Sequence, residues 1–186
     1  MKTYTEYKPF VHHPNFKADR AVALDNLDLT LIDHPLIHLV KHINSLPYVF
    51  TLQCCSGHFI TKDGKEIANF ELSETEVRVK YRLAYIAFCI ENNPAGKNIR
   101  QRLMEIPLSI DADKVQFCSA QWFWEQWPNS YALQIMPKRF RDQDTAQIEY
   151  MEAREIQKVR DEFFAFLIDV ISRLVQTRVA YTTSLP

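Results

Sequence analysis

Residues 53–58 read Gln-Cys-Cys-Ser-Gly-His and gather chemically capable side chains in one short turn. Cys55 is a candidate nucleophile if a neighbour such as His58 lowers the pKa of its thiol. Ser56 and the backbone N–H groups around Gly57 can bind a carboxylate, a phosphate or the edge of a cofactor. His58 is a candidate general base. The alternative is a strand-end turn with two buried, inert thiols, because free cysteine is among the most buried residue types.

Three histidines, His34, His38 and His42, recur every four residues and would lie along one face of a helix. Two histidines at this spacing can chelate a metal, and Cys55 or His58 could complete the ligand set, because the helix leads directly into the strand before the turn. The alternative is a solvated helix face. No HExxH or CxxC motif accompanies the histidines, so no metal is assigned from the sequence.

Familiar nucleotide and hydrolase motifs are missing from the chain. It contains no GxGxxG, no GxxxxGK[ST] and no GxSxG pattern. A nucleotide-type cofactor would therefore bind in a non-Rossmann manner.

The elements that position the turn follow from residue spacing. Apolar residues at helical intervals predict a helix over residues 18–31. A second helix is expected to start at Asp33, a good N-cap followed by Pro35, and to end at 45–47. Its apolar stripe consists of Leu36, Leu39, Val40 and Ile43. Residues 48–52 predict the strand that enters the turn, and residues 62–65 predict a hairpin turn beyond it.

Later segments predict more strands and two more helices. A return strand is expected at 67–72, a capping box at 73–76 and a strand over 77–90, with helices at 95–106 and 147–177. Residues 114–125 and 131–136 predict a β-hairpin, followed by a charged link at 139–145. The prediction is an α+β fold with a mostly antiparallel, non-Rossmann sheet covered by helices and a long C-terminal helix.

The predicted hairpin is rich in aromatic residues, with three tryptophans between residues 122 and 127. Stacking of bases on these rings, beside Lys138 and Arg139, would suit nucleic-acid binding. Alternation along the predicted strand favours packing in the core instead.

Composition limits the class of protein. The chain has 186 residues, 47% hydrophobic content and a net charge of −1, which suits one domain over residues 1–186 with no bulk attraction to nucleic acid or membrane. It opens without an apolar signal segment, and no apolar run reaches the roughly 18 residues of a membrane span. We expect a cytoplasmic protein whose four cysteines are reduced.

A longer motif includes the turn and the helix before it. Residues 32–44 read IDHPLIHLVKHIN, and Tyr48, Thr51 and Cys-Ser-Gly at 55–57 follow. This block resembles the opening of the wybutosine-synthesis tRNA methyltransferase family. Members of that family carry an Asp before a helix reading roughly I-x-x-L-V-x-x-I-N, then a Tyr-x-Thr strand and a Ser-Ser-Cys-Ser-Gly-Arg turn.

The resemblance implies a fold unlike the Rossmann methyltransferases, S-adenosylmethionine as methyl donor and a tricyclic modified guanosine of tRNA as acceptor. It implies that the Cys-Ser-Gly turn belongs to the active region. The matching positions are Asp33, Asn44, Tyr48, Thr51, Cys55, Ser56 and Gly57. Cys55 and Ser56, with His58, are the expected catalytic residues, and the other matching positions are the expected cofactor-binding residues.

The sequence also departs from the family pattern. Gln53 and Cys54 replace the two serines, and His58 replaces the arginine, which removes a fixed cation. The family's later segment with Trp and His has no clear counterpart between residues 67 and 106.

Three functions are therefore carried forward. The first is a divergent methyltransferase-like protein that binds S-adenosylmethionine or a modified nucleotide at the 53–58 turn and positions donor and acceptor, with tRNA as a candidate partner. The second is a non-catalytic ligand-binding protein of the same fold. The third is a metal-dependent enzyme that uses His38 and His42 with the turn.

Overall fold

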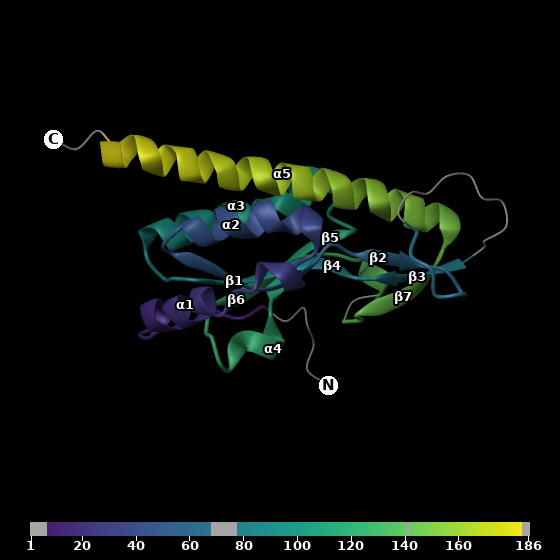
Figure 1. The fold of residues 1–186 in the computed structure, drawn as a ribbon, viewed down its shortest axis with the longest axis horizontal. Helices are drawn as coiled ribbons and strands as arrows, with labels where there is room; N and C mark the ends of the chain where they lie inside the picture. The colour runs from purple at the N-terminus through teal and green to yellow at the C-terminus, as the bar shows by residue number, and fades with distance from the viewer. Residues whose placement is uncertain (1–6, 68–77, 141, 184–186) are drawn as a thin grey trace.

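The computed structural model describes residues 7–67, 78–140 and 142–183, with side chains described to residue 176. Its strands form two antiparallel sheets (Figure 1). The four-stranded sheet has the order β1-β4-β6-β5, and the three-stranded sheet has the order β2-β3-β7. The strands are β1 Val49–Cys55, β2 His58–Ile60, β3 Arg78–Arg82, β4 Ala84–Ile90, β5 Val115–Ser119, β6 Ser130–Ile135 and β7 Thr145–Glu149.

Two of the three passages of the chain between the described strands of the two sheets lie at neighbouring points. Residues 56–57 connect β1 to β2, and Leu83 connects β3 to β4. Because β1 pairs with β4 and β2 pairs with β3, the two connections lie side by side. The Cys-Ser-Gly turn therefore sits where the two sheets meet.

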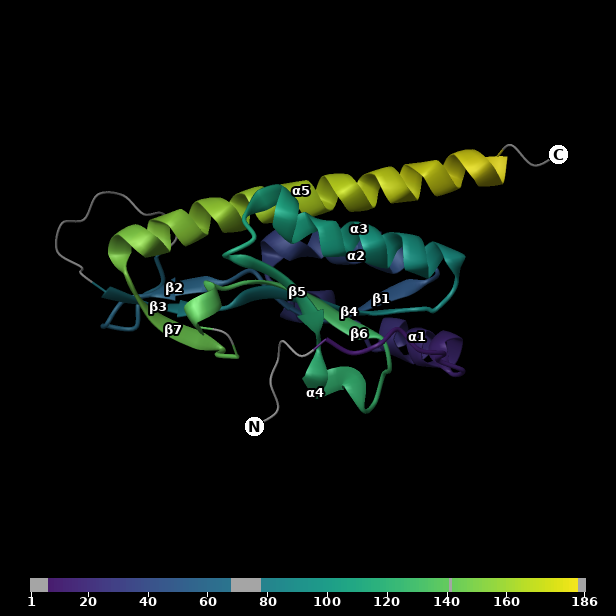
Figure 2. The same cartoon turned by 180° about the vertical axis from the view of Figure 1, so that it is seen from behind.

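Helices cover both faces of the four-stranded sheet (Figures 1 and 2). The helices α2 and α3 pack on one face, and α5 begins over the three-stranded sheet and then runs across α2 and α3. The helices α1 and α4 lie on the opposite face. Their bounds are α1 Phe16–Asp25, α2 Ile37–Ser45, α3 Pro94–Ile110, α4 Gln121–Trp124 and α5 Tyr150–Thr183. Short 3₁₀ helices are η1 Leu29–Leu31, η2 His34–Leu36 and η3 Lys138–Phe140.

The structure confirms the predicted α+β class and most of the elements. The predicted stripe of the second helix is buried in the main core, which lies between the helices and the sheets. That helix opens with the 3₁₀ turn η2, which contains Pro35, before α2 begins. The predicted helix 18–31 is shorter, because α1 ends at Asp25 and η1 follows separately. Among the described helices, none is both long and apolar enough to cross a membrane.

Two predicted elements are wrong. The strand expected over 114–125 ends at Ser119, and residues 121–124 form the short helix α4. Apolar residues at positions 120, 123, 124 and 127 recur at helical spacing, which accounts for that turn. The strand β7 takes the place of the end of the predicted charged link and the start of the predicted final helix. Its Ala146 and Ile148 are buried, and the residues between and after them are exposed. Pairing with β3 decides this strand, so α5 starts later than predicted.

Some predicted elements fall outside the described residues. The capping box at 73–76 does, and so does most of the return strand at 67–72. Of that strand, Ile67 is described, and its N–H donates to the carbonyl of Phe59. The turn at 62–65 is confirmed by hydrogen bonds that join Thr61 to Gly64 and Lys65.

Candidate functional site

Gly57 lets the chain cross between the sheets. Its φ is +82°, in the left-handed region that favours glycine. A Cβ at this position would lie 2.6 Å from the Cβ of Ala84, at the start of β4. The turn therefore needs a residue without a side chain, for reasons of both backbone conformation and space.

Asp33 ties the start of the helical segment to this turn. The sequence predicts that its carboxylate caps the helix, but the carboxylate makes no such capping hydrogen bond. It accepts instead a 2.6 Å hydrogen bond from the N–H of Ser56. Burial works against ionisation of Asp33. Hydrogen bonds from Ser56 and the charges of His58 and Arg82 outweigh this effect and hold its pKa below the usual value.

The backbone N–H groups of Ser56 and Gly57 already have acceptors. That of Ser56 donates to Asp33, and that of Gly57 points at Sγ of Cys55 at 3.5 Å. The expected cradle of backbone donors for a ligand is thus already partnered. Polar recognition next to the turn would have to come from side chains.

Cys55 and His58 flank the turn in different surroundings. Burial, together with the nearby charge of Asp33, raises the pKa of the Cys55 thiol against the opposing hydrogen bond from Gly57. This is the opposite of the lowered pKa that an activated thiolate needs. Nε2 of His58 lies 3.5 Å from Oδ2 of Asp33, and its Nδ1 lies 2.6 Å from Oε1 of Glu66. Burial also raises the pKa of Cys54, to about 11.

Two arginines, Arg82 and Arg160, lie next to the turn. Arg82 is the ladder partner of His58 across β2 and β3. Arg160 of α5 donates a 3.3 Å hydrogen bond to the carbonyl of Gly57, and its guanidinium lies over the ring of Phe59. Sequence reasoning missed both residues, because only the pairing of distant segments brings them here.

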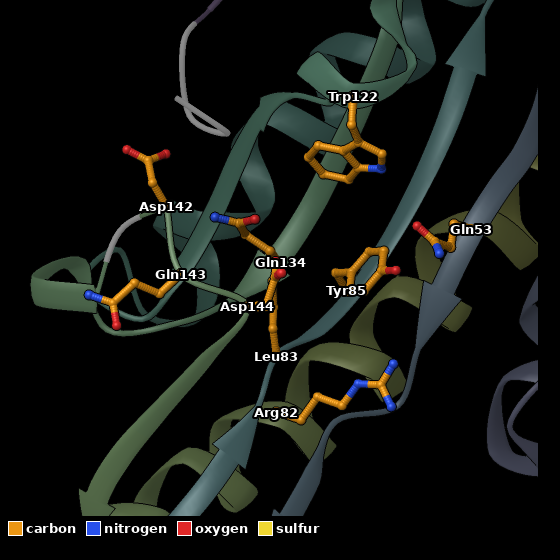
Figure 3. Close-up of a pocket in the computed structure, with 9 residues that line it drawn as sticks. All are labelled: Gln53, Arg82, Leu83, Tyr85, Trp122, Gln134, Asp142, Gln143 and Asp144. Atoms are coloured by element: carbon orange, nitrogen blue, oxygen red, sulfur yellow. The ribbon is translucent and has the colours of Figure 1, made fainter. Parts of the chain in front are cut away.

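A pocket of about 420 Å³ opens beside the turn (Figure 3). Tyr85 and Trp122 meet edge to face in it, with ring centroids 6.3 Å apart. Tyr85 is the ladder partner of Cys55, as Arg82 is of His58, so two lining residues face the turn directly. Figure 3 shows the amide of Gln53 pointing toward Tyr85. The lining residues are Gln53, Arg82, Leu83, Tyr85, Trp122, Gln134, Asp142, Gln143 and Asp144.

Three of the residues expected to bind a cofactor lie elsewhere. Asn44 donates to Oγ1 of Thr51 at 2.8 Å and accepts from the N–H of Thr51 at 2.9 Å, which ties α2 to β1. Thr51 lies four residues before Cys55, or about 13 Å along an extended strand. Tyr48 precedes β1 at that same far end and packs against the main core. Asp33 and Gly57 are the two cofactor-binding candidates that lie at the turn.

The histidine face is not part of the turn. The rings of His38 and His42 lie 4.1 Å apart, and Nδ1 of His42 is 3.4 Å from Oγ of Ser172. Within the described part of the chain, one group of three His, Cys, Asp or Glu residues has ligand atoms within 4.8 Å of one another. That group is Asp33, Cys55 and His58, so it includes neither His38 nor His42.

The aromatic segment divides between core and pocket. Trp124 packs edge to face on the buried Tyr131, whereas Trp122 is 37% exposed and lines the pocket. The nearby cations pair with carboxylates of the chain, Lys138 with Asp113 and Arg139 with Glu152.

Comparison with known proteins gives weak structural likeness. No model of a known protein family matches the sequence, and no curated protein matches it. Two structures of the PH1069 protein from Pyrococcus horikoshii are similar, with TM-scores of 0.44 and 0.46 and 16% and 15% identity. They cover 89% and 93% of this chain, and 95% and 98% of their own. A hypothetical protein from Aeropyrum pernix has a TM-score of 0.42 and 13% identity, over 77% of this chain and 99% of its own. Likeness of this degree says nothing about what the chain binds.

Proposed function

We propose that this protein binds S-adenosylmethionine or a modified nucleotide in the pocket beside residues 53–58, as a divergent relative of the wybutosine-synthesis methyltransferases. The observation that carries the proposal is the pocket itself. Its volume lies in the range of small-ligand sites, and two of its lining residues are ladder partners of Cys55 and His58.

The lining residues suit a ligand with an aromatic base and charged groups. The Tyr85 and Trp122 pair offers aromatic surface for a purine ring. The amides of Gln53 and Gln134 can recognise polar edges of a base. Arg82 suits the carboxylate of a methionine group or a phosphate.

The acidic residues of the pocket suit the other end of the same ligand. Asp142, Gln143 and Asp144 follow η3 in the chain and line the pocket (Figure 3). Carboxylates there can accept from an amino group or a ribose hydroxyl. A pocket with Arg82 and these carboxylates fits a zwitterion such as S-adenosylmethionine better than a purely anionic ligand.

Isothermal titration of the purified protein with S-adenosylmethionine tests the proposal. We expect binding that weakens about tenfold in Arg82→Gln and in Trp122→Ala, because each removes one to two kcal/mol of ligand contact, roughly. Arg102→Gln is the matched control, since Arg102 is exposed on α3 and hydrogen-bonds to Asn98. No heat and no thermal shift with millimolar S-adenosylmethionine would rule out the methyltransferase version. The same titration with a guanosine nucleotide and with tRNA then tests the nucleotide version.

The second candidate is ligand binding without turnover. The raised pKa of the Cys55 thiol favours it, because a protonated thiol is not poised for nucleophilic work. Binding that is unchanged in Cys55→Ala and His58→Ala, without methyl transfer to bulk tRNA, would support this candidate. Methyl transfer that either substitution abolishes would exclude it.

A further inference from the structure

Asp33, Cys55 and His58 converge from three separate segments of the chain. Asp33 precedes η2, Cys55 ends β1 and His58 begins β2. One carboxylate oxygen, one thiol sulfur and one imidazole nitrogen lie within 4.8 Å of one another. These three donor types together are typical ligands of zinc.

The spacing of His58 and Asp33 fits two ligands of a single ion. Bond lengths of about 2.0–2.3 Å in a tetrahedral site put any two zinc ligands roughly 3.3–3.6 Å apart. Nε2 of His58 lies 3.5 Å from Oδ2 of Asp33. That distance is too long for a hydrogen bond of normal strength but is suited to two ligands of one metal.

Hydrogen-bond partners of Asp33, Cys55 and His58 hold these three side chains in positions that suit metal binding. Glu66 lies 2.6 Å from Nδ1 of His58, so Nδ1 can donate to this carboxylate and leave Nε2 as the nitrogen available to a metal. Metal-bound histidines commonly have such a carboxylate on the other ring nitrogen. The N–H groups of Ser56 and Gly57 hold the Asp33 oxygen and the Cys55 sulfur from behind.

We propose that Asp33, Cys55 and His58 bind one zinc ion, with water in the fourth position. On binding, the Cys55 thiol releases its proton to solvent, and the two anionic ligands neutralise the charge of the ion. Nε2 of His58 is then a metal ligand, which removes His58 as a general base. This ion would stand beside the pocket at the ladder partners of Tyr85 and Arg82.

Cobalt substitution tests the site without any ligand of the pocket. Protein purified without an affinity tag is stripped with a chelator and titrated with Co²⁺, which reports thiolate ligation through sulfur-to-cobalt charge-transfer absorption. We expect one equivalent of Co²⁺, displaced by Zn²⁺, with the charge-transfer band present. Cys55→Ser should lose the band, whereas Cys54→Ser, the neighbouring thiol, should keep it. His42→Ala should also keep it, because His42 lies outside the group.

A second variant separates ligation from folding. Glu66 has a largely exposed side chain, so Glu66→Gln should leave the circular dichroism spectrum unchanged and still weaken metal binding about 10–100-fold. Absence of stoichiometric binding at micromolar Co²⁺ and Zn²⁺ would overturn the proposal. A band that survives Cys55→Ser would do so too. Either result leaves the titration of the pocket with S-adenosylmethionine unaffected, so the two proposals can fail separately.

Discussion

At the scale of single residues, Asp33 joins the parts of the site. Its carboxylate accepts a hydrogen bond from the N–H of Ser56, lies 3.5 Å from Nε2 of His58 and is within 4.8 Å of the sulfur of Cys55. An aspartate before a helix ordinarily accepts a hydrogen bond from the first turn of that helix. The carboxylate of Asp33 makes no such bond and accepts from the N–H of Ser56 instead. Because this contact holds its pKa below the usual value, Asp33 carries its negative charge at neutral pH.

Gly57 gives the sharpest prediction at this scale. Gly57→Ala should lower the free energy of unfolding by about 2–4 kcal/mol, because left-handed strain and a 2.6 Å clash with Ala84 add together. Gly64→Ala is the matched control. Gly64 also has a left-handed φ, of +77°, but no atom within 4 Å of the added Cβ, so its cost should be about 1 kcal/mol. Urea unfolding measures both losses. Equal losses would contradict a steric role for Ala84.

At the scale of elements, the residue spacing of a segment predicts a helix or strand only where that spacing, and not pairing with a distant segment, decides the structure. The buried stripe of α2 and the alternation of β3 were readable, because each segment's own spacing selects its face. The strand β7 was missed because Gln147 and Glu149 point outward on a five-residue strand, which exists through pairing with β3. The alternation of Val115, Phe117, Trp122 and Trp124 predicts one continuous strand, but residues 121–124 form the helix α4.

The candidate site also combines residues that a local motif predicts with residues that only sheet pairing and helix packing bring there. The position of the turn and of Gly57 in it followed from a contiguous motif, whereas Asp33 was expected as an N-cap and not as the acceptor for the N–H of Ser56. Arg82, Tyr85 and Arg160 come from later strands and from α5, so their approach depends on sheet register and helix packing. The sequence pattern of one strand does not show which residues of a distant strand pair with it, so the pocket could not be predicted from the sequence.

The connection from α3 to β5 gives a prediction of pH dependence. Asp111 accepts hydrogen bonds from the side chain and N–H of Lys114 and from the N–H of Asp113. Burial of Asp111 favours its neutral form, but these hydrogen bonds outweigh it and lower the pKa. A lowered folded-state pKa stabilises the protein above the unfolded pKa, roughly 3.9, and this contribution is lost as pH falls through the folded value.

Asp111→Asn should therefore cost about 0.5–1 kcal/mol at pH 7 after allowance for solvent screening. The cost should shrink as the pH is lowered toward 3.5. Asp113→Asn is the control, because Asp113 is 84% exposed in its pair with Lys138 and should change stability by less than about 0.5 kcal/mol. Thermal unfolding of both variants between pH 7 and about pH 2 measures the effect, because the loss lies below the unfolded pKa of roughly 3.9. A cost for Asp111→Asn that grows on acidification would reverse the assigned sign.

At the scale of the whole molecule, α5 links the two sheets, because it packs against elements of both. Its 34 residues begin over β3 and β7 and then cross α2 and α3, which cover the four-stranded sheet (Figures 1 and 2). Its Arg160 also reaches the carbonyl of Gly57 at the junction of the sheets. A single helix packed on both sheets should make them unfold as one unit.

The tryptophans let this coupling be measured. All three lie in or just after α4, on the four-stranded sheet, whereas Ile156 lies near the start of α5, the helix that begins over the three-stranded sheet. Ile156 is fully buried, so Ile156→Ala should cost about 2–4 kcal/mol. Because the sheets are coupled, the midpoint seen by tryptophan fluorescence should fall as far as the midpoint seen by circular dichroism. Met151→Ala, on the same helix but 61% exposed, should move neither midpoint appreciably. If Ile156→Ala lowered the dichroism midpoint and left the fluorescence midpoint in place, the two sheets would be separate folding units.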